Sequence, residues 1–184
     1  MASKTKTKTT KKTKASDEAA MMAAWQKAMT PSKGHVRLEP MVGTFATKTT
    51  FVMGPGLPEQ VSEGISVHRW VLGGRYLEQV YTGSSMGMPF EGIGFTGYDN
   101  VQQKYVGTWM DSFGTGIMDS VGIGKPTAKV MEFDGKSVGP DGKLVKFLCK
   151  VRIKDRDRHT YEMWTKGPGG KLFRMMLVEY TRKA

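Results

Sequence analysis

The sequence predicts an all-β protein, an up-and-down antiparallel β-barrel of about ten strands with one N-terminal helix. Three observations support this fold. From about residue 41 onward, apolar and polar residues alternate with the period of two that is typical of strands. Glycine-rich turn signals separate these segments, and the 184-residue chain contains 23 glycines. Many antiparallel strands joined by short turns are expected to close, because closure removes both exposed sheet edges.

The chain begins with a basic leader, residues 1–15, that we expect to be disordered. Residues 1–14 hold six lysines and no acidic residue, so they supply more than half of the formal net charge of +11. Mobile positive charge of this kind supports weak, salt-sensitive and non-specific contact with nucleic acid. The leader has no arginine and no aromatic residue for base stacking, so this partner is a minor alternative.

A helix is expected over residues 16–30, and it opens the single domain predicted for residues 16–184. Ser16 is a suitable N-cap, acidic side chains follow it in the first turn, and Pro31 ends the helix. Methionine and tryptophan side chains form one apolar stripe along this helix: Met21, Met22, Trp25 and Met29. Such a stripe usually packs on its own domain, so we expect it to cover one end of the barrel.

The strands are expected at residues 41–53, 61–72, 75–83, 91–98, 104–113, 117–123, 128–134, 144–154, 158–166 and 171–181. Turn signals such as Gly73-Gly74 and Asp134-Gly135 separate them. The alternation is clearest in residues 144–154, where four apolar side chains share one face: Phe147, Cys149, Val151 and Ile153. A barrel of this size can hold side chains or one small ligand, so the fold offers an interior.

The hairpin formed by residues 104–113 and 117–123 places two aspartates at related positions. In both segments the odd-numbered residues are the more apolar, so both odd faces are expected to point into the core. This parity requires a three-residue loop, residues 114–116, and sets Asp111 directly opposite Asp119. Facing carboxylates inside a barrel repel unless a cation or a shared proton offsets the repulsion, which would make a functional site. At the barrel mouth, the same two groups would simply be hydrated.

Three motifs resemble those of the bacterial domain of unknown function 1579. They are HRWVLGGRYLEQVYTG at residues 68–83, PFEGIGFTGYDN at residues 89–100 and YVGTWMDS at residues 105–112. The resemblance covers about residues 41–180 and implies a calycin-like, lipocalin-type barrel. It implies no established activity, so it assigns no catalytic residue. Residues 42–45 resemble the Gly-x-Trp opening of such barrels, with Phe45 in the place of the tryptophan.

The candidate ligand-binding residues are those expected to face the interior: His68, Trp70, Arg75, Tyr98, Trp109, Asp111 and Asp119. An inward arginine needs a partner, and Asp111 or Asp119 would be the natural partner of Arg75. No two histidines have metal-ligand spacing, so no metal site is expected. His68 or His159 could ligate haem in a barrel of this shape. The glycine- and tryptophan-rich signature of haem-binding barrels is absent, however, so no cofactor is expected.

The favoured function is the binding of a small, mostly apolar ligand inside the barrel, without catalysis. One alternative is an enzyme that uses the Asp111/Asp119 pair for proton transfer, and another is a structural or homo-oligomerising barrel. No apolar run is long enough to span a membrane, so no membrane partner is expected. The single cysteine, Cys149, is typical of a reducing compartment, so a cytoplasmic location is expected.

Overall fold

The computed structural model describes residues 10–184, with side chains from residue 15 onward. The chain divides into two compact units, residues 1–30 and residues 31–184, and each is described by itself. In the first unit, helix α1 (Thr10–Met29) confirms the expected N-terminal helix. The expected helix start was wrong, because Ser16 lies inside α1 and does not cap it. Residues 10–15 contain no glycine or proline, so nothing in this part of the leader stops the helix from extending.

The remainder of the basic leader, residues 1–9, lies outside the described residues. The packing of the apolar stripe of α1 against the barrel stays a prediction. No helix in the described part of the chain is both long enough and apolar enough to cross a membrane.

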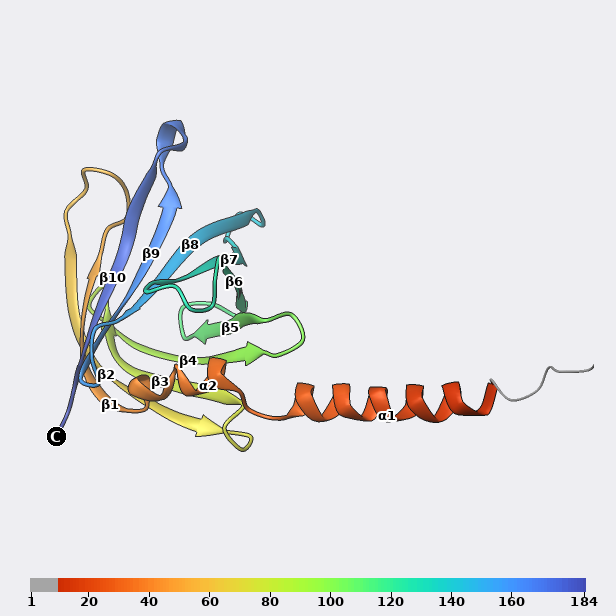
Figure 1. Ribbon diagram of the computed structural model, residues 1–184. Coiled ribbons are helices and arrows are strands. Elements are labelled where there is room, and N and C mark those ends of the chain that lie inside the picture. Colours follow the sequence, from red (N-terminus) through yellow and green to blue (C-terminus); the bar gives the residue numbers. More distant parts are fainter. Residues whose placement is uncertain (1–9) are drawn as a thin grey trace, which may run out of the picture. The chain divides into compact units, whose positions relative to one another are not determined.

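The second unit is a closed barrel of ten antiparallel strands, which confirms the expected fold class (Figure 1). The strands are β1 (Gly43–Phe51), β2 (Gln60–Val71), β3 (Tyr76–Ser85), β4 (Met88–Asp99), β5 (Lys104–Asp111), β6 (Met118–Ile123), β7 (Met131–Val138), β8 (Leu144–Ile153), β9 (Arg158–Lys166) and β10 (Leu172–Arg182). Each strand pairs with its neighbours in sequence, and β1 closes the barrel by pairing with β10. The topology is therefore up-and-down throughout.

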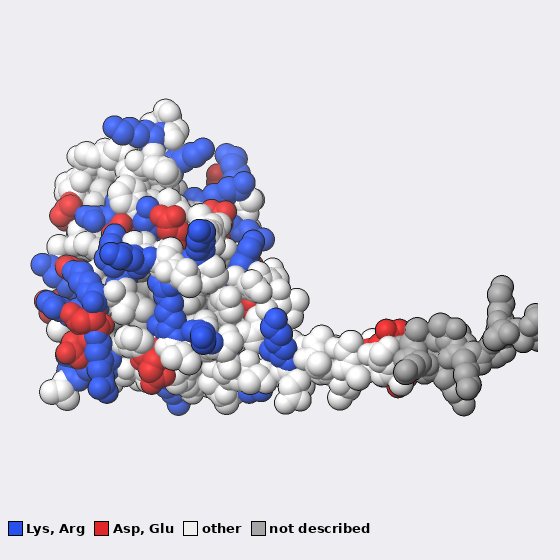
Figure 2. Space-filling view, viewed as in Figure 1, with Lys and Arg blue, Asp and Glu red and all other residues white. Residues whose placement is uncertain are grey.

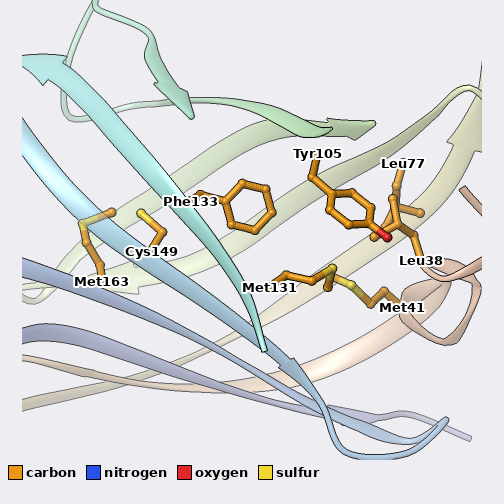
Figure 3. Close-up of a cluster of buried hydrophobic side chains, with 8 residues drawn as sticks. All are labelled: Leu38, Met41, Leu77, Tyr105, Met131, Phe133, Cys149 and Met163. Carbon is orange, nitrogen blue, oxygen red and sulfur yellow. The ribbon is translucent and has the colours of Figure 1, made fainter. Parts of the chain in front are cut away.

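The segment before β1 closes one end of the barrel, and we call this segment the plug. It contains the short helix α2 (Lys33–Val36) and the 3-10 helix η1 (Glu39–Met41). Leu38 and Met41 are buried because both side chains enter the barrel core. Figure 3 shows the cluster that they join: Leu38, Met41, Leu77, Tyr105, Met131, Phe133, Cys149 and Met163.

Arg182, near the C-terminus, ties the plug to the barrel. Its guanidinium donates hydrogen bonds to the carbonyl oxygens of Val42 at 2.7 Å and Pro40 at 2.9 Å. It also donates to the carbonyl oxygen of Arg156, in the turn between β8 and β9. The same guanidinium lies over the ring of Phe45, 4.6 Å from its centroid. These contacts join the plug, β1 and the β8–β9 turn at one point.

Strand β7 occupies residues where the sequence predicted a turn, so that prediction was wrong. Asp134 and Gly135 lie in the middle of β7, where the sequence indicated a turn. A Cβ on Gly135 would lie 3.2 Å from the sulfur of Cys149 on the neighbouring strand, so the glycine permits close packing. The Asp-Gly sequence looks the same in a turn and in the middle of a strand, and only the contact with the neighbouring strand distinguishes the two.

Candidate functional site

The inner wall of the barrel carries many glycines: Gly64, Gly83, Gly92, Gly94, Gly107, Gly122 and Gly135. Two aromatic side chains, Trp109 and Tyr81, occupy the space that four of these glycines leave: Gly64, Gly83, Gly92 and Gly94. A Cβ on Gly92 would lie 2.2 Å from the ring of Trp109, and one on Gly94 would lie 2.8 Å from it. A Cβ on Gly64 would lie 2.4 Å from the hydroxyl oxygen of Tyr81. These rings therefore lie against the wall and do not project across the interior.

Side chains that point into the middle of the barrel and toward its open end keep partial exposure to solvent. They include Gln79, Thr96, Trp109, Met118, Ser120, Phe147, Tyr161 and Met176. Inward-facing side chains nearer the plug are buried instead, with Leu77 exposed by 2% and Tyr105 by 4%. Because the same barrel wall supplies both groups, the difference marks the interior space that lies nearer to solvent. We call this space the lumen.

Trp109 and Asp111, both on β5, form the polar part of the lumen wall near its open end. The carboxylate of Asp111 accepts a hydrogen bond from Nε1 of Trp109 at 2.9 Å and one from the backbone nitrogen of Phe113 at 3.0 Å. Both side chains are half-buried. Asp111 thereby orients the indole along the wall and also fixes the start of the loop formed by residues 112–117.

Asp119 does not face Asp111, so the expected carboxylate pair was wrong. In the observed register of β5 and β6, Asp119 pairs with Thr108. Asp119 is exposed on the outer side of the barrel, whereas Asp111 belongs to the inner wall. The strands are joined by residues 112–117, a longer loop than the expected residues 114–116. Carboxylates on opposite sides of the wall cannot share a proton or a cation, so the geometry removes the basis of the proton-transfer alternative.

The outer side of β6 explains this error. Val121 and Ile123 point outward and are exposed by 40% and 37%, respectively. Ser120 and Gly122 point inward. Counting apolar residues assigned the wrong side of this strand to the interior, because its outer side is the more apolar one.

Two of the candidate ligand-binding residues hold the plug in place. Trp70 donates a hydrogen bond from Nε1 to Oε2 of Glu39, at 2.7 Å. The ring of Tyr98 packs edge-on against His35, with the ring centroids 5.9 Å apart. A Cβ on Gly34 would lie 2.3 Å from the Tyr98 ring, so this ring also fills the space beside α2. Both aromatic residues thus shape the closed end of the barrel.

Arg75 does not partner either aspartate, contrary to expectation. It lies in the turn between β2 and β3, at the plugged end, and is exposed. Its guanidinium donates a hydrogen bond to the carbonyl oxygen of Leu72 at 2.9 Å. Leu72 has a positive φ of 49°, so this hydrogen bond supports a tight turn.

His68 belongs to a buried polar cluster beneath the lumen. Its Nε2 lies 2.8 Å from the hydroxyl oxygen of Ser66. Gln79 donates from Nε2 to this hydroxyl at 3.0 Å and to the hydroxyl of Tyr180 at 3.1 Å. His159 stacks on Tyr180, with ring centroids 4.1 Å apart and an interplanar angle of 11°. Gln79 therefore links the lumen to a fully buried layer of polar groups.

Burial keeps this polar cluster uncharged. Burial, and then the charge of Arg182, lowers the pKa of His68 from 6.5 to about 4. Burial, and then the charges of His68 and Arg182, lowers the pKa of His159 to about 3. Burial raises the pKa of the Tyr180 hydroxyl to about 12. At neutral pH the layer beneath the lumen therefore carries no charge.

The described residues offer little for metal or nucleophile chemistry. They contain no group of three His, Cys, Asp or Glu side chains that could hold a metal ion. Cys149 is buried and accepts a hydrogen bond from the Tyr161 hydroxyl at 3.2 Å. Burial raises the pKa of Cys149, so its reactive thiolate form is disfavoured at neutral pH.

A second hollow lies at the plugged end, away from the lumen. Its volume is about 570 Å³, and it is lined by Val36, Arg37, Pro40, Thr127, Lys129, Arg152, Ile153 and Lys154. The guanidinium of Arg37 donates hydrogen bonds to the carbonyl oxygens of Pro126 and Ala128. The hollow opens widely to solvent and its lining has no aromatic side chain, so it is poorly suited to enclose an apolar ligand.

Several lumen residues were not identified from the sequence: Gln79, Ser120, Phe147, Tyr161 and Met176. The alternation along β9 contained a usable signal, because Tyr161 and Met163 share the face of the buried His159. In β10 the register shifts between Arg174 and Met176. The irregularity lies before Met176, which keeps the parity of the buried Val178 and Tyr180, so counting back from these two residues places Met176 inward.

Comparisons with known proteins identify relatives of this barrel. A family model described as "Protein of unknown function (DUF1579)" matches residues 30–182. No curated protein matches the sequence. Rv2717c from M. tuberculosis has a similar structure, with a TM-score of 0.61 and 17% sequence identity, covering 84% of this chain and 100% of its own. The S-type phycobiliprotein lyase CPES from Guillardia theta has a TM-score of 0.53 and 9% identity, covering 84% of this chain and 99% of its own. At these identities the likeness shows a shared fold alone.

Proposed function

The chain belongs to the DUF1579 family of proteins of unknown function, and we propose that it binds a small, mostly apolar molecule in the lumen of its barrel. One observation carries this proposal: inward-facing side chains in the lumen remain partly exposed although ten strands enclose them. An interior that served only as a hydrophobic core would be close-packed, and these side chains would be buried. The plug closes the barrel at one end, so a ligand enters at the other.

The lining of the lumen fits an apolar ligand. Trp109, Phe147 and Tyr161 offer aromatic surface, while Met118 and Met176 offer flexible thioethers. Methionine side chains adapt their shape easily, so such a lining tolerates ligands of different outline. The lumen should therefore discriminate by size and polarity more than by exact shape.

A few polar groups are placed to orient the ligand. Ser120, Thr96 and Gln79 lie on the lumen wall and are partly exposed. The lumen residues named above include one carboxylate, Asp111, and no basic side chain. The cluster beneath the lumen is uncharged at neutral pH. These features favour an uncharged ligand with one or two hydrogen-bonding groups over an anionic ligand.

The test is a fluorescence titration of the full chain with N-phenyl-1-naphthylamine. This probe is uncharged, which matters because Lys and Arg side chains are spread over the surface shown in Figure 2. We expect saturable binding with one probe per barrel. Ser120→Phe places a ring in the lumen and should weaken binding by at least about tenfold. Ile123→Phe is the matched control, because Ile123 lies on the outer side of the same strand.

The control variant should bind the probe as tightly as the unmodified chain. Equal binding by both variants would place the probe outside the lumen and would overturn the proposal. Lack of saturable binding by the unmodified chain would do the same. A cytoplasmic location belongs to this proposal as well, and it is supported by the single reduced and buried Cys149.

A further inference from the structure

The hollow at the plugged end has a lining in which every charged residue is basic. Four of its eight lining residues carry a positive charge and none carries a negative one: Arg37, Lys129, Arg152 and Lys154. We call these four residues the cationic lining. Arg37 belongs to the plug, Lys129 to the connection between β6 and β7, and the other two to the end of β8 and the turn after it. The fold therefore gathers these charges from three segments that are distant in the sequence.

Backbone hydrogen bonds hold the walls of this hollow in place. The guanidinium of Arg37 donates to the carbonyl oxygens of Pro126 and Ala128, which fixes the connection between β6 and β7 beside the plug. The backbone nitrogen of Lys154 donates to the carbonyl oxygen of Arg158 at 3.0 Å, which fixes the turn after β8. The hollow is thus formed before a ligand binds, and a preformed site spends less binding free energy on ordering the chain.

No acidic side chain neutralises the cationic lining. Among residues whose side chains the structure describes, none of these four cations is in an ion pair. The carboxylates of the flanking β7 and β8–β9 turn have basic partners of their own: Glu132 with Lys150 at 2.8 Å, Asp155 with Arg158 at 2.7 Å and Asp157 with Arg182 at 3.2 Å. The carboxylate of Glu39, in the plug, accepts a hydrogen bond from Trp70 on β2. Like charges around one concave surface create a positive potential that attracts anions.

The size and chemistry of the hollow favour a small phosphorylated ligand. Its volume of about 570 Å³ lies within the range of small-molecule sites, about 300–1,000 Å³. Arginine binds phosphate with two parallel hydrogen bonds, and lysine binds it as a point charge. A ligand with a single carboxylate would leave most of the positive charge unmatched. Val36, Pro40 and Ile153 supply apolar surface for an organic part of the ligand.

We propose that this hollow binds a small anion that carries two or more linked phosphate groups, held by the cationic lining. Thr127 adds a hydroxyl group to the same wall as Lys129. The inference goes beyond the proposed function, because the hollow lies at the plugged end and does not depend on what the lumen holds. Failure of one proposal leaves the other standing.

The test is isothermal titration calorimetry of the full chain with sodium tripolyphosphate, at about 0.15 M salt to screen weak surface attraction. We expect saturable binding of one anion per chain. The double variant Lys129→Gln/Arg152→Gln removes two of the four charges and should raise the Kd by at least about tenfold. The matched control is Lys136→Gln/Lys146→Gln. These two exposed lysines pair across β7 and β8 and do not line the hollow, so the control should keep the Kd within about twofold of the original.

Urea denaturation of each variant confirms that the barrel is intact, as expected for substitutions of exposed side chains. Absence of saturable tripolyphosphate binding by the unmodified chain would overturn the proposal. Equal loss of affinity in the two double variants would also overturn it, because it would assign the binding to net positive charge, including that of the leader.

A second arm identifies the source of the phosphate groups. The chain is sedimented with phosphatidylcholine vesicles that contain phosphatidic acid. Cosedimentation that the hollow variant loses and the control variant keeps supports the site and assigns the phosphates to lipid headgroups. Tripolyphosphate binding without cosedimentation supports the site with a soluble ligand. Cosedimentation that both double variants keep, in chains that do not bind tripolyphosphate, would contradict the site.

Discussion

The indole nitrogen of Trp109 donates a hydrogen bond to the carboxylate of Asp111, at 2.9 Å, along the inner wall of the barrel. The ring lies where side chains on Gly92 and Gly94 would otherwise be. The glycines therefore do more than permit turns, because they let a large aromatic residue lie flat.

The two roles of Trp109 can be separated by substitution. Trp109→Phe keeps a ring on the glycine pair but loses the hydrogen bond to Asp111, so the free energy of unfolding should fall by about 1 kcal/mol. Trp109→Ala also removes the ring and should lower it by about 3 kcal/mol. Urea denaturation measures both. Equal losses in the two variants would mean that the ring does not pack on the glycines.

Acid should destabilise the barrel through His68 and His159. Both have folded-state pKa values below the ordinary histidine value of 6.5, about 4 and about 3 respectively. As the pH falls, the unfolded chain therefore takes up protons first. Stability is complete above about pH 6.5 and is lost as the pH falls toward the folded-state pKa values. At about 1.4 kcal/mol per pKa unit, His68 alone accounts for a loss on the order of 3 kcal/mol.

The measurement is the free energy of unfolding from about pH 7 to about pH 4.5, where carboxylates still contribute little. His159→Phe keeps a ring stacked on Tyr180 but cannot take up a proton, so its stability should depend less on pH. Identical pH profiles for this variant and the original chain would contradict the buried, neutral state of His159.

The orientation of β6 can be tested by labelling single cysteines. Asp119→Cys and Ser120→Cys are each made in a Cys149→Ala background and treated with a polyethylene-glycol maleimide too large for the lumen. Asp119 is outward and exposed, so its cysteine should react much faster than the cysteine at the inward position 120. Faster labelling at position 120 would contradict the observed register and would support the one in which the two aspartates face each other.

Arg182 should be among the most important residues for keeping the plug in place. Arg182→Ala removes the hydrogen bonds to the Val42 and Pro40 carbonyl oxygens and should cost about 2 to 3 kcal/mol in urea denaturation. Arg182→Lys retains the charge but not the forked geometry, so it should recover only part of the loss. Full recovery with lysine would show that charge alone matters at this position.

The barrel was predictable from the sequence, because period-two alternation and turn residues both act locally. Ten segments with this pattern leave closure as the simplest way to remove the sheet edges. The plug was not predictable in the same way. Helix α2 has four residues, too few to show a helical period, and nothing in the pattern indicated that Leu38 would enter the core.

The candidate site was predicted less well than the fold, for a physical reason. Trp109 and Asp111 do lie on the lumen wall, and His68 does point inward. Asp119 was assigned to the wrong side because the rule that apolar residues face inward fails on β6. The lumen takes small and polar residues such as Ser120, while Val121 lies on the outer side.

The central claim, a hollow lumen that takes an apolar guest, is tested most directly by NMR of methionine methyl groups. The full chain, labelled with ¹³C at these methyls, is titrated with N-phenyl-1-naphthylamine. Met118 and Met176 lie on the inner side of the wall, and Met110 lies on its outer side. We predict that the signals of Met118 and Met176 shift together to saturation while that of Met110 stays in place. Unchanged inner methyls, or a shift confined to Met110, would contradict the account.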